Sequence, residues 1–196
     1  MNHYFIYDPN REKNIIEIEG IVNGTKYQFS TDRGIFSYAH LDPGTITLIE
    51  EVKITNNISS VLDLGCGYGV IGIVLKKENE NLKVTQTDIN ERAVELTIIN
   101  NKKYKINNEV YLSDGFEKIT EKFDLITLNP PIKAGKQIIF ELYKNAYNFL
   151  NNEGEFYCVV KKNHGADSHY KYLKEVFGNA SIVKKNKGFY VIKTKK

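Results

Sequence analysis

Between residues 59 and 178 the chain alternates short apolar runs with longer amphipathic stretches. The apolar runs are rich in Val, Ile and Leu, which is typical of strands buried on both faces. Repeated strand–helix units of this kind predict a mainly parallel sheet covered by helices on both sides. The expected strands are 61–64, 83–87, 109–112, 123–128 and 155–160, and the expected helices are 70–77, 91–104, 136–150 and 168–177.

The first forty residues differ from this pattern. The runs 15–19 and 26–30 favour extended structure, and Asn23-Gly24 between them is the strongest short signal for a hairpin turn. We therefore expect a small N-terminal β-hairpin that caps the main body of the protein.

A helix is expected next, over 43–52, with Asp42 as its N-cap and Pro43 in its first turn. At the other end, strands 181–184 and 189–193 flank Asn186-Lys187-Gly188, so the last strand should run antiparallel. Together these elements predict an α/β, Rossmann-like fold with a seven-stranded, mainly parallel sheet. We expect one domain over residues 1–196, divided into a hairpin cap (1–40) and a core (41–196).

The spacing of apolar residues in the helix expected over 91–104 predicts which of its faces is buried. Ala93, Leu96 and Ile99 recur at helical spacing, with Ile98 at the edge of the stripe. Asn90 precedes this helix and is a good N-cap residue.

The chemistry-bearing residues follow the expected strands, and in such sheets ligands bind beyond the carboxyl ends of the strands. The first cluster is Asp63 with Gly65, Gly67 and Gly69, in a turn that opens a helix. Glycines there let the backbone turn sharply and approach a ligand closely. Dinucleotide enzymes use a similar turn, but a carboxylate at Asp63 would repel a pyrophosphate and suits an ammonium group. This favours S-adenosylmethionine (SAM) over NAD.

Acidic residues also end the next two strands. Asp88, about 20 residues after the glycine turn, can accept hydrogen bonds from both ribose hydroxyls of either cofactor. Because Asn90 can cap the following helix, Asp88 is left for this role. Asp114-Gly115 ends the third strand beside the expected adenine position, although an ordinary Asp-Gly turn explains it equally well.

The fourth expected strand ends in Asn129-Pro130-Pro131-Ile132. Two prolines fix φ and remove two backbone N–H donors, so the carbonyls there face no competing donors. The Asn129 side-chain oxygen and the Pro130 carbonyl can both accept from one NH₂ group. That geometry directs the lone pair of a conjugated amine toward a methyl donor.

Composition excludes several other classes of protein. The 196 residues carry 27 basic and 24 acidic side chains, a net charge of +3, which fits neither a disordered polyelectrolyte nor a histone-like polycation. Cys66 and Cys158 lie in apolar runs and indicate buried thiols rather than a disulfide framework. No signal-peptide pattern and no membrane-spanning run is present, so we expect a cytoplasmic protein.

No metal site is expected. The four histidines (His3, His40, His164 and His169) lack ligand spacing, and we expect them at the surface or at helix caps.

These motifs resemble those of the class I SAM-dependent methyltransferases that carry an N-P-P-[FYWI] motif. The likeness extends over nearly the whole chain to the small-domain, RsmC-type family of 16S rRNA guanine-N2 methyltransferases. The segments that carry it run in the same order and are His3-Tyr4-Phe5, 29–37, 42–45, the glycine turn, 129–135 and 161–168. The longer members have an additional N-terminal domain, so the chain resembles the compact ones.

The resemblance implies methyl transfer to the exocyclic N2 amine of a guanine in ribosomal RNA or the small ribosomal subunit. The implied catalytic residues are Asn129, Pro130, Pro131 and Ile132. The implied SAM-binding residues are Phe36, Thr45, Asp63, Gly65, Gly67, Gly69, Asp88, Ile89, Asp114 and Gly115. Many relatives have an aromatic residue after the two prolines, where it can stack on the base, and Ile132 offers only an apolar contact.

The residues leave other functions open. An adenine N6 amine or a glutamine side-chain amide is also a planar NH₂ group, and a SAM-binding module without catalysis has the same glycine turn. An NAD oxidoreductase is the weakest alternative. Lys133, Lys136 and Lys161-Lys162 are expected at the mouth of the site, where they could contact RNA phosphates, with Lys184, Lys185 and Lys187 on a less certain face.

Overall fold

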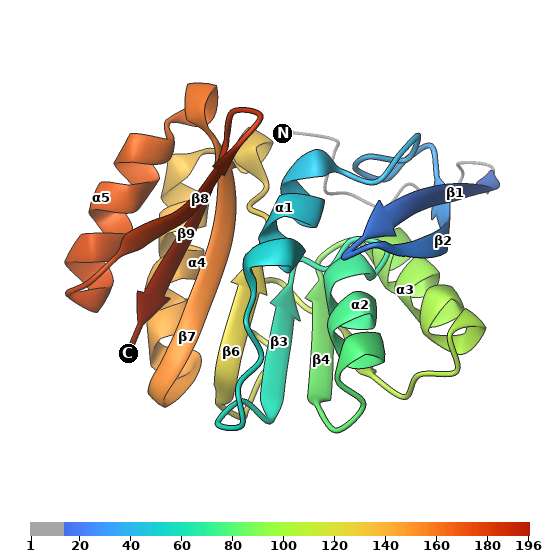
Figure 1. Cartoon of the computed structure of the whole chain (residues 1–196), viewed down its shortest axis with the longest axis horizontal. Coiled ribbons are helices and arrows are strands. Elements are labelled where there is room, and N and C mark those ends of the chain that lie inside the picture. The colour runs from blue at the N-terminus through green and yellow to red at the C-terminus, as the bar shows by residue number, and fades with distance from the viewer. Residues whose placement is uncertain (1–13) are drawn as a thin grey trace.

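A seven-stranded sheet forms the centre of the computed structural model, which describes residues 14–196 (Figure 1). Its strand order is β5-β4-β3-β6-β7-β9-β8, and β9 is antiparallel to both of its neighbours. The sheet predicted from the sequence is therefore confirmed. Its strands are β3 (Ser60–Leu64), β4 (Lys83–Asp88), β5 (Glu109–Leu112), β6 (Phe123–Leu128), β7 (Leu150–Lys161), β8 (Ser181–Asn186) and β9 (Phe189–Lys195).

Helices cover both faces of this sheet, and in Figure 1 α1 and α2 lie in front of it. Successive strand residues point to opposite faces, so Val61 joins one apolar cluster and Leu62 the other. The first cluster includes residues of α1, α2, α3 and the hairpin, and the second includes residues of α4 and α5. The helices are α1 (Pro43–Glu51), α2 (Val70–Glu78), α3 (Glu91–Lys103), α4 (Lys136–Phe149) and α5 (Ala166–Phe177), with short 3-10 turns η1 (Ile132–Ala134) and η2 (Lys162–His164).

The expected N-terminal hairpin is present as β1 (Ile15–Val22) and β2 (Thr25–Asp32). Asn23 and Gly24 both have positive φ, 48° and 76°, as a two-residue hairpin turn requires. The hairpin is anchored to the core at the end opposite its turn. There the Arg92 guanidinium lies 2.9 Å from the carboxylate of Asp32, the last residue of β2. Both side chains are nearly buried, so this pair joins β2 firmly to α3.

The stripe predicted on α3 was only half right. Ala93 and Leu96 are buried, but Ile98 and Ile99 lie on the exposed side. Polar residues take their place on the buried face: Thr97, Asn100 and Asn101. Periodicity of apolar residues could not reveal this, because these polar side chains are buried for the hydrogen bonds that they make. Asn90 caps the helix as expected, with its side chain accepting from the N–H of Arg92.

Other element boundaries differ little from expectation. The strand predicted over 155–160 is longer, because Leu150 already pairs with Phe123 before the register shifts. Helix α5 begins two residues early, at Ala166.

Both cysteines are buried and free. The segment His3-Tyr4-Phe5 lies outside the described residues, and no helix within residues 14–196 is long and apolar enough to cross a membrane.

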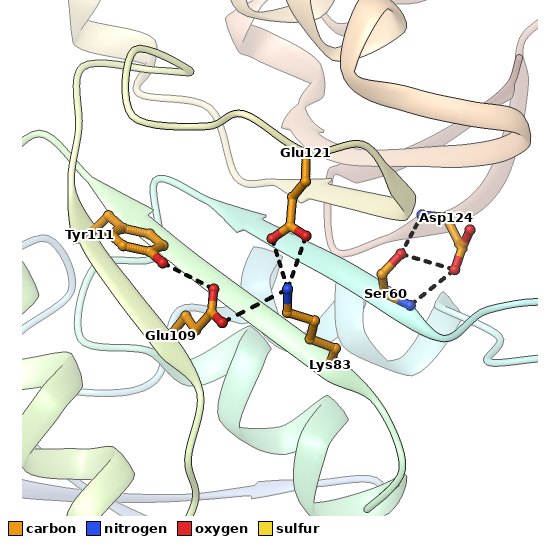
Figure 2. A network of polar contacts seen from close by, with 6 residues as sticks. All are labelled: Ser60, Lys83, Glu109, Tyr111, Glu121 and Asp124. Atoms are coloured by element: carbon orange, nitrogen blue, oxygen red, sulfur yellow. Dashed lines mark hydrogen bonds and ion pairs between the residues drawn. The ribbon is translucent and has the colours of Figure 1, made fainter.

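The amino-terminal edge of the sheet is held together by polar contacts, some of which Figure 2 shows. The Asp124 carboxylate accepts from the backbone N–H and the hydroxyl of both Ser59 and Ser60, and from Asn151. Burial alone would raise the pKa of Asp124, but these hydrogen bonds outweigh it and lower the pKa to about 2. Nearby, Lys83 pairs with Glu121 and Glu109 in a more exposed setting.

Asp124→Asn tests this edge. The lowered pKa means that Asp124 stabilises the fold above its unfolded pKa of about 3.8, and that this stability is lost as the pH falls toward 2. We expect the substitution to lower the free energy of unfolding by about 1–2 kcal/mol at pH 7. Urea unfolding should show the difference shrinking near pH 2.5.

Glu121→Gln is the matched control, because Glu121 and Lys83 are 41% and 52% exposed. An exposed pair of this kind contributes little to stability, so that change should cost clearly less than Asp124→Asn. Equal losses in both variants, or a loss in Asp124→Asn that does not depend on pH, would contradict the account.

Candidate active site at the carboxyl edge of the sheet

The register of the central strands brings the predicted clusters to one edge. Leu64 at the end of β3 pairs with Thr87 of β4 and with Leu128 of β6. The next residues along the chain, Gly65, Asp88 and Asn129, therefore lie side by side. Strand β3 is also where the chain order of the sheet reverses, which is where ligands bind in sheets of this type.

The glycine turn has the backbone that the sequence predicts. Gly65, Gly67 and Gly69 have φ of 66°, 59° and 94°, a region that side chains rarely adopt. Among residues 14–196, a Cβ at Gly67 would meet nothing within 4 Å, and one at Gly65 would meet only Leu128, at 3.7 Å. Open space therefore lies beside the backbone of these two residues, and a ligand can approach it there. Gly69 serves as the N-cap of α2.

Asp63 is fully buried beneath this turn. One carboxylate oxygen, Oδ2, accepts from the N–H of Gly72 at 2.9 Å and from Nε2 of Gln86 at 3.2 Å. The other, Oδ1, is buried and has no hydrogen-bond partner among the described residues. Burial is the main cause that raises the pKa of Asp63 to about 6, and the charge of Asp88 adds to it. The site thus holds an acceptor that is available to a ligand.

The Asp88 carboxylate faces the glycine turn and also fixes its backbone through a hydrogen bond. Its Oδ2 accepts from the N–H of Gly67 at 2.8 Å and its Oδ1 from the N–H of Asn90 at 2.9 Å. A carboxylate has about four acceptor positions, so roughly two remain for ligand hydroxyls. Burial raises the pKa of Asp88 to about 6, although these backbone hydrogen bonds act in the opposite direction.

The other predicted cofactor residues lie on segments that are bonded to β4 or to the glycine turn. The N–H of Ser113 donates to the Asp88 carbonyl, which places Asp114 and Gly115 next to the end of β4. Asp114 and Ile89 are exposed. Phe36, 51% exposed, belongs to the segment between β2 and α1, and Ser37 in that segment accepts from the Tyr68 hydroxyl of the glycine turn.

Asn129 is held by the start of α1. Its Nδ2 donates to Oδ2 of Asp42 at 3.1 Å and to Oγ1 of Thr45 at 2.9 Å. Asp42 is at the same time the N-cap of α1, accepting from the N–H of Thr45 at 2.7 Å. Thr45 was predicted as a cofactor residue, and in the structure its hydroxyl contacts Asn129. After the two prolines, Ile132 is partly buried and packs against the second apolar cluster.

Three residues that support the site were not found from the sequence. Gln86 bridges Asp63 and the carbonyl of Gly69. Thr97 donates to the carbonyl of Gly67 at 2.8 Å, and Asn100 donates to that of Tyr68, also at 2.8 Å. All three are completely buried. The only signal available was that polar residues occupy the positions of a strand and a helix that should be apolar.

The prediction of a surface or capping role was wrong for His169. This residue is buried in α5, and its Nδ1 lies 2.8 Å from the hydroxyl of Tyr143 in α4. Burial, together with the charge of Lys136, lowers the pKa of His169 to about 4, so it is neutral and belongs to the packing between these helices. Among residues 14–196, no group of three His, Cys, Asp or Glu side chains is arranged to bind a metal.

The comparison with known families is decisive for the class of protein. The family model "Methyltransferase small domain" matches residues 26–193. The chain belongs to this family. It is therefore a SAM-dependent methyltransferase with the class I fold.

Similar proteins show how far this assignment extends. The "Uncharacterized protein YbxB" of Bacillus subtilis is 34% identical over 99% of this chain and 98% of its own. "Ribosomal RNA small subunit methyltransferase C" of Haemophilus influenzae is 39% identical over 83% of this chain, which spans 49% of that protein. The structure of a T. thermophilus 16S rRNA N2 methyltransferase (RsmC) with AdoMet and guanosine matches with a TM-score of 0.82. It is 22% identical and covers 96% of this chain and 52% of its own.

The site of this small-domain methyltransferase suits SAM in its charge and shape. The unsatisfied Oδ1 of Asp63 can accept from an ammonium group, and the acceptor positions left on Asp88 can take ribose hydroxyls. Gly65 and Gly67 leave room for a ligand against the backbone. A cation bound here would also offset the cost of holding two ionised carboxylates, one buried and one half-buried, in the same site.

Asp63→Asn tests this arrangement. The raised pKa means that Asp63 favours folding below its unfolded pKa of about 3.8, and that this contribution is lost as the pH rises through 6. Between pH 5 and 8 the stability of the variant should therefore rise relative to wild type, by on the order of 1–3 kcal/mol. Urea unfolding of the ligand-free protein at pH 5 and at pH 8 measures this change in stability.

The same substitution should weaken SAM binding at least tenfold, which calorimetry measures.

Asp167→Asn is a suitable control, because Asp167 is an exposed carboxylate on α5. It should change neither the pH dependence nor the affinity for SAM. If Asp63→Asn bound SAM as tightly as wild type, the ammonium could not be the partner of Asp63.

Proposed function

We propose that the protein is a cytoplasmic enzyme that methylates the exocyclic N2 amine of a guanine in 16S rRNA. The observation that supports this most strongly is the orientation of the Asn129 amide. Its nitrogen is taken by Asp42 and Thr45, so its oxygen is left to accept from an incoming NH₂ group. The printed names of the relatives supply the class of acceptor, a small-subunit ribosomal RNA.

In this proposal each predicted cofactor residue keeps its role. Asp63 takes the ammonium group of SAM, Asp88 the ribose, and Ile89, Asp114 and Gly115 the adenine. Gly65, Gly67 and Gly69 let the methionine end lie against the backbone, while Phe36 and Thr45 close the pocket from the N-terminal side. SAM itself supplies an activated methyl group on a sulfonium.

The protein then acts by holding the acceptor rather than by acid–base chemistry. The Asn129 oxygen and the Pro130 carbonyl accept from the target amine, so its lone pair faces the methyl donor. Pro131 offers no N–H to compete, and Ile132 gives the base an apolar contact in place of an aromatic one. Orientation of this kind can supply about 7–11 kcal/mol of the barrier. The amine proton is released to water after the transfer.

A basic rim beside Asn129 supports a nucleic-acid substrate. The Lys161 ammonium lies over the ring of Phe189, which packs against α1 at Gly44. Lys162 follows directly and bonds through its N–H to Gly188. The end of the Lys136 side chain lies beside Gly165, at the start of α5. All three lysines are exposed and form no ion pair with an acidic group of residues 14–196.

Lysines at the opposite edge of the sheet contrast with this rim. Lys83 pairs with Glu121 and Glu109, and Lys195 pairs with Glu153. These two lysines are thus paired with carboxylates, whereas the three lysines of the rim are not. A phosphate backbone is the partner that such a rim attracts. A base in folded RNA must also be turned out of its stack to reach the site.

Asn129→Ala tests the catalytic role. We expect the rate of methyl transfer to fall at least a hundredfold, because the amine loses one of its two acceptors, while SAM still binds. Labelled SAM with unmodified small ribosomal subunits measures the rate, and calorimetry measures SAM binding. In the wild type, the label should appear at N2 of one guanine.

Other outcomes would identify the alternatives. Label on adenine N6 or on a protein glutamine would replace the proposed acceptor. An unchanged methylation level in cells that carry Asn129→Ala would indicate a SAM-binding module that assists a partner.

The basic rim can be tested with Lys161→Gln/Lys162→Gln. Loss of two phosphate contacts should raise the KM for RNA several-fold and reduce the slope of log affinity against log salt by about 1–2. SAM affinity should not change. Filter binding of the ribosomal RNA across a salt series measures the slope.

The control is Lys83→Gln/Lys195→Gln, which removes the same charge from the opposite edge. It should leave the KM and the salt slope near wild type. An equal effect of both double variants would mean that net charge, and not the rim, attracts the RNA.

A further inference from the structure

Asn129 takes part in a contact between two segments of the chain, and neither segment belongs to the glycine turn. The turn after β6 meets the N-terminus of α1, where Asp42 caps the helix. The side chains of Asp42 and Thr45 accept the two hydrogens of the Asn129 amide nitrogen, at 3.1 and 2.9 Å. Both acceptors belong to one helical turn, so their positions are fixed together.

The two contacts have different consequences for the orientation of the amide. The Thr45 hydroxyl can donate or accept, so it would tolerate either orientation. The Asp42 carboxylate can only accept, and a rotated amide would place its own oxygen against that charge. Asp42 therefore decides which end of the amide turns toward the acceptor amine. Its charge also polarises the amide, which makes the free oxygen a stronger acceptor.

The packing behind Asp42 keeps it in this position. Gly44 is buried, and a Cβ there would lie 2.8 Å from the ring of Phe189 and 2.9 Å from Oδ2 of Asp42. Only glycine lets the helix start, the ring and the carboxylate come this close. Phe189 begins β9, so the cap of α1 is supported by the core sheet and not by a free loop.

We propose that Asp42 is a positioning residue for methyl transfer, which orients the Asn129 amide so that its oxygen faces the amine. This rests on the proposed role of Asn129. Thr45 assists by taking the second hydrogen, and Gly44 provides the space. Asp42 itself touches neither the cofactor nor the amine.

Asp42→Asn tests the proposal first. Asparagine is also a good N-cap, so α1 should remain folded. Its amide can meet Asn129 with either end, and the fixed orientation is lost. We expect kcat to fall about tenfold, with SAM affinity and the KM for RNA near wild type. Glu50→Gln, an exposed change on the same helix, is the control and should match wild type.

A pair of charge-swapped variants gives a readout that a structural role would not affect. Asn129→Asp places a second carboxylate against Asp42, and close carboxylates retain a proton between them. Relative to wild type at each pH, this variant should be at least tenfold more active at pH 6 than at pH 8. Asp42→Asn/Asn129→Asp restores a donor facing an acceptor, so the pH dependence should disappear and the rate at pH 8 should rise at least tenfold.

Other charged and titratable groups near the site are the same in every variant, so the comparison with wild type at each pH removes their effect. Asp63 and Asp88, with pKa values raised to about 6, titrate in this range, and His40 lies two residues before Asp42. Burial and the charge of Asp42 raise the pKa of Tyr68 well above the range tested, so it stays neutral. Lys161 lies behind the ring of Phe189 and is present in every variant.

Two outcomes would overturn the positioning role. One is wild-type kcat in Asp42→Asn, and the other is a pH dependence of Asn129→Asp that survives the second substitution. Failure of the proposed function looks different, since wild type would then label an amine other than guanine N2. The same set of variants, assayed on that amine, would still decide the role of Asp42.

Discussion

The parallel pairing of β3 with β4 and β6 is the constraint on which the rest of the site depends. These three strands are buried on both faces, and Leu64, Thr87 and Leu128 are aligned across them. A slip of one residue would turn buried side chains to the opposite face, so apolar packing fixes the register strongly. The same register places the glycine turn, Asp88 and Asn129 at one edge, and thus core packing determines the geometry of the site.

Two carboxylates of the site are held where their charged forms are disfavoured as long as no ligand is bound. Asp63 and Asp88 both have pKa values raised to about 6, mainly because burial disfavours their charged forms. Perturbed carboxylates in a cleft are typical of functional sites, because selection for stability alone would replace them. In Asp124, at the opposite edge, hydrogen bonds lower the pKa and stabilise the fold. The two edges of the sheet therefore differ in electrostatic character.

Sequence patterns predicted the sheet, the helices and the residues that end each strand, because these depend on local periodicity and on turn chemistry. The patterns failed where a residue is buried for its hydrogen bonds. On α3, Thr97 and Asn100 occupy the buried face that Ile99 was expected to share. His169 likewise lies between two helices because Tyr143 satisfies it. The contact of Asp42 with Asn129 spans 87 positions of the chain, and no local pattern reports such a pairing.

The hydrogen bonds of Asn100 have a consequence for motion. Its side chain accepts from Ser30 and donates to the carbonyls of Ser30 and Tyr68, so one buried amide ties β2 to the glycine turn. Opening either segment alone would leave polar groups unsatisfied in the interior, which is costly. The hairpin and the glycine turn should therefore open and close as one cooperative unit. The hairpin is, in this sense, part of the framework that holds the glycine turn rather than a separate lid.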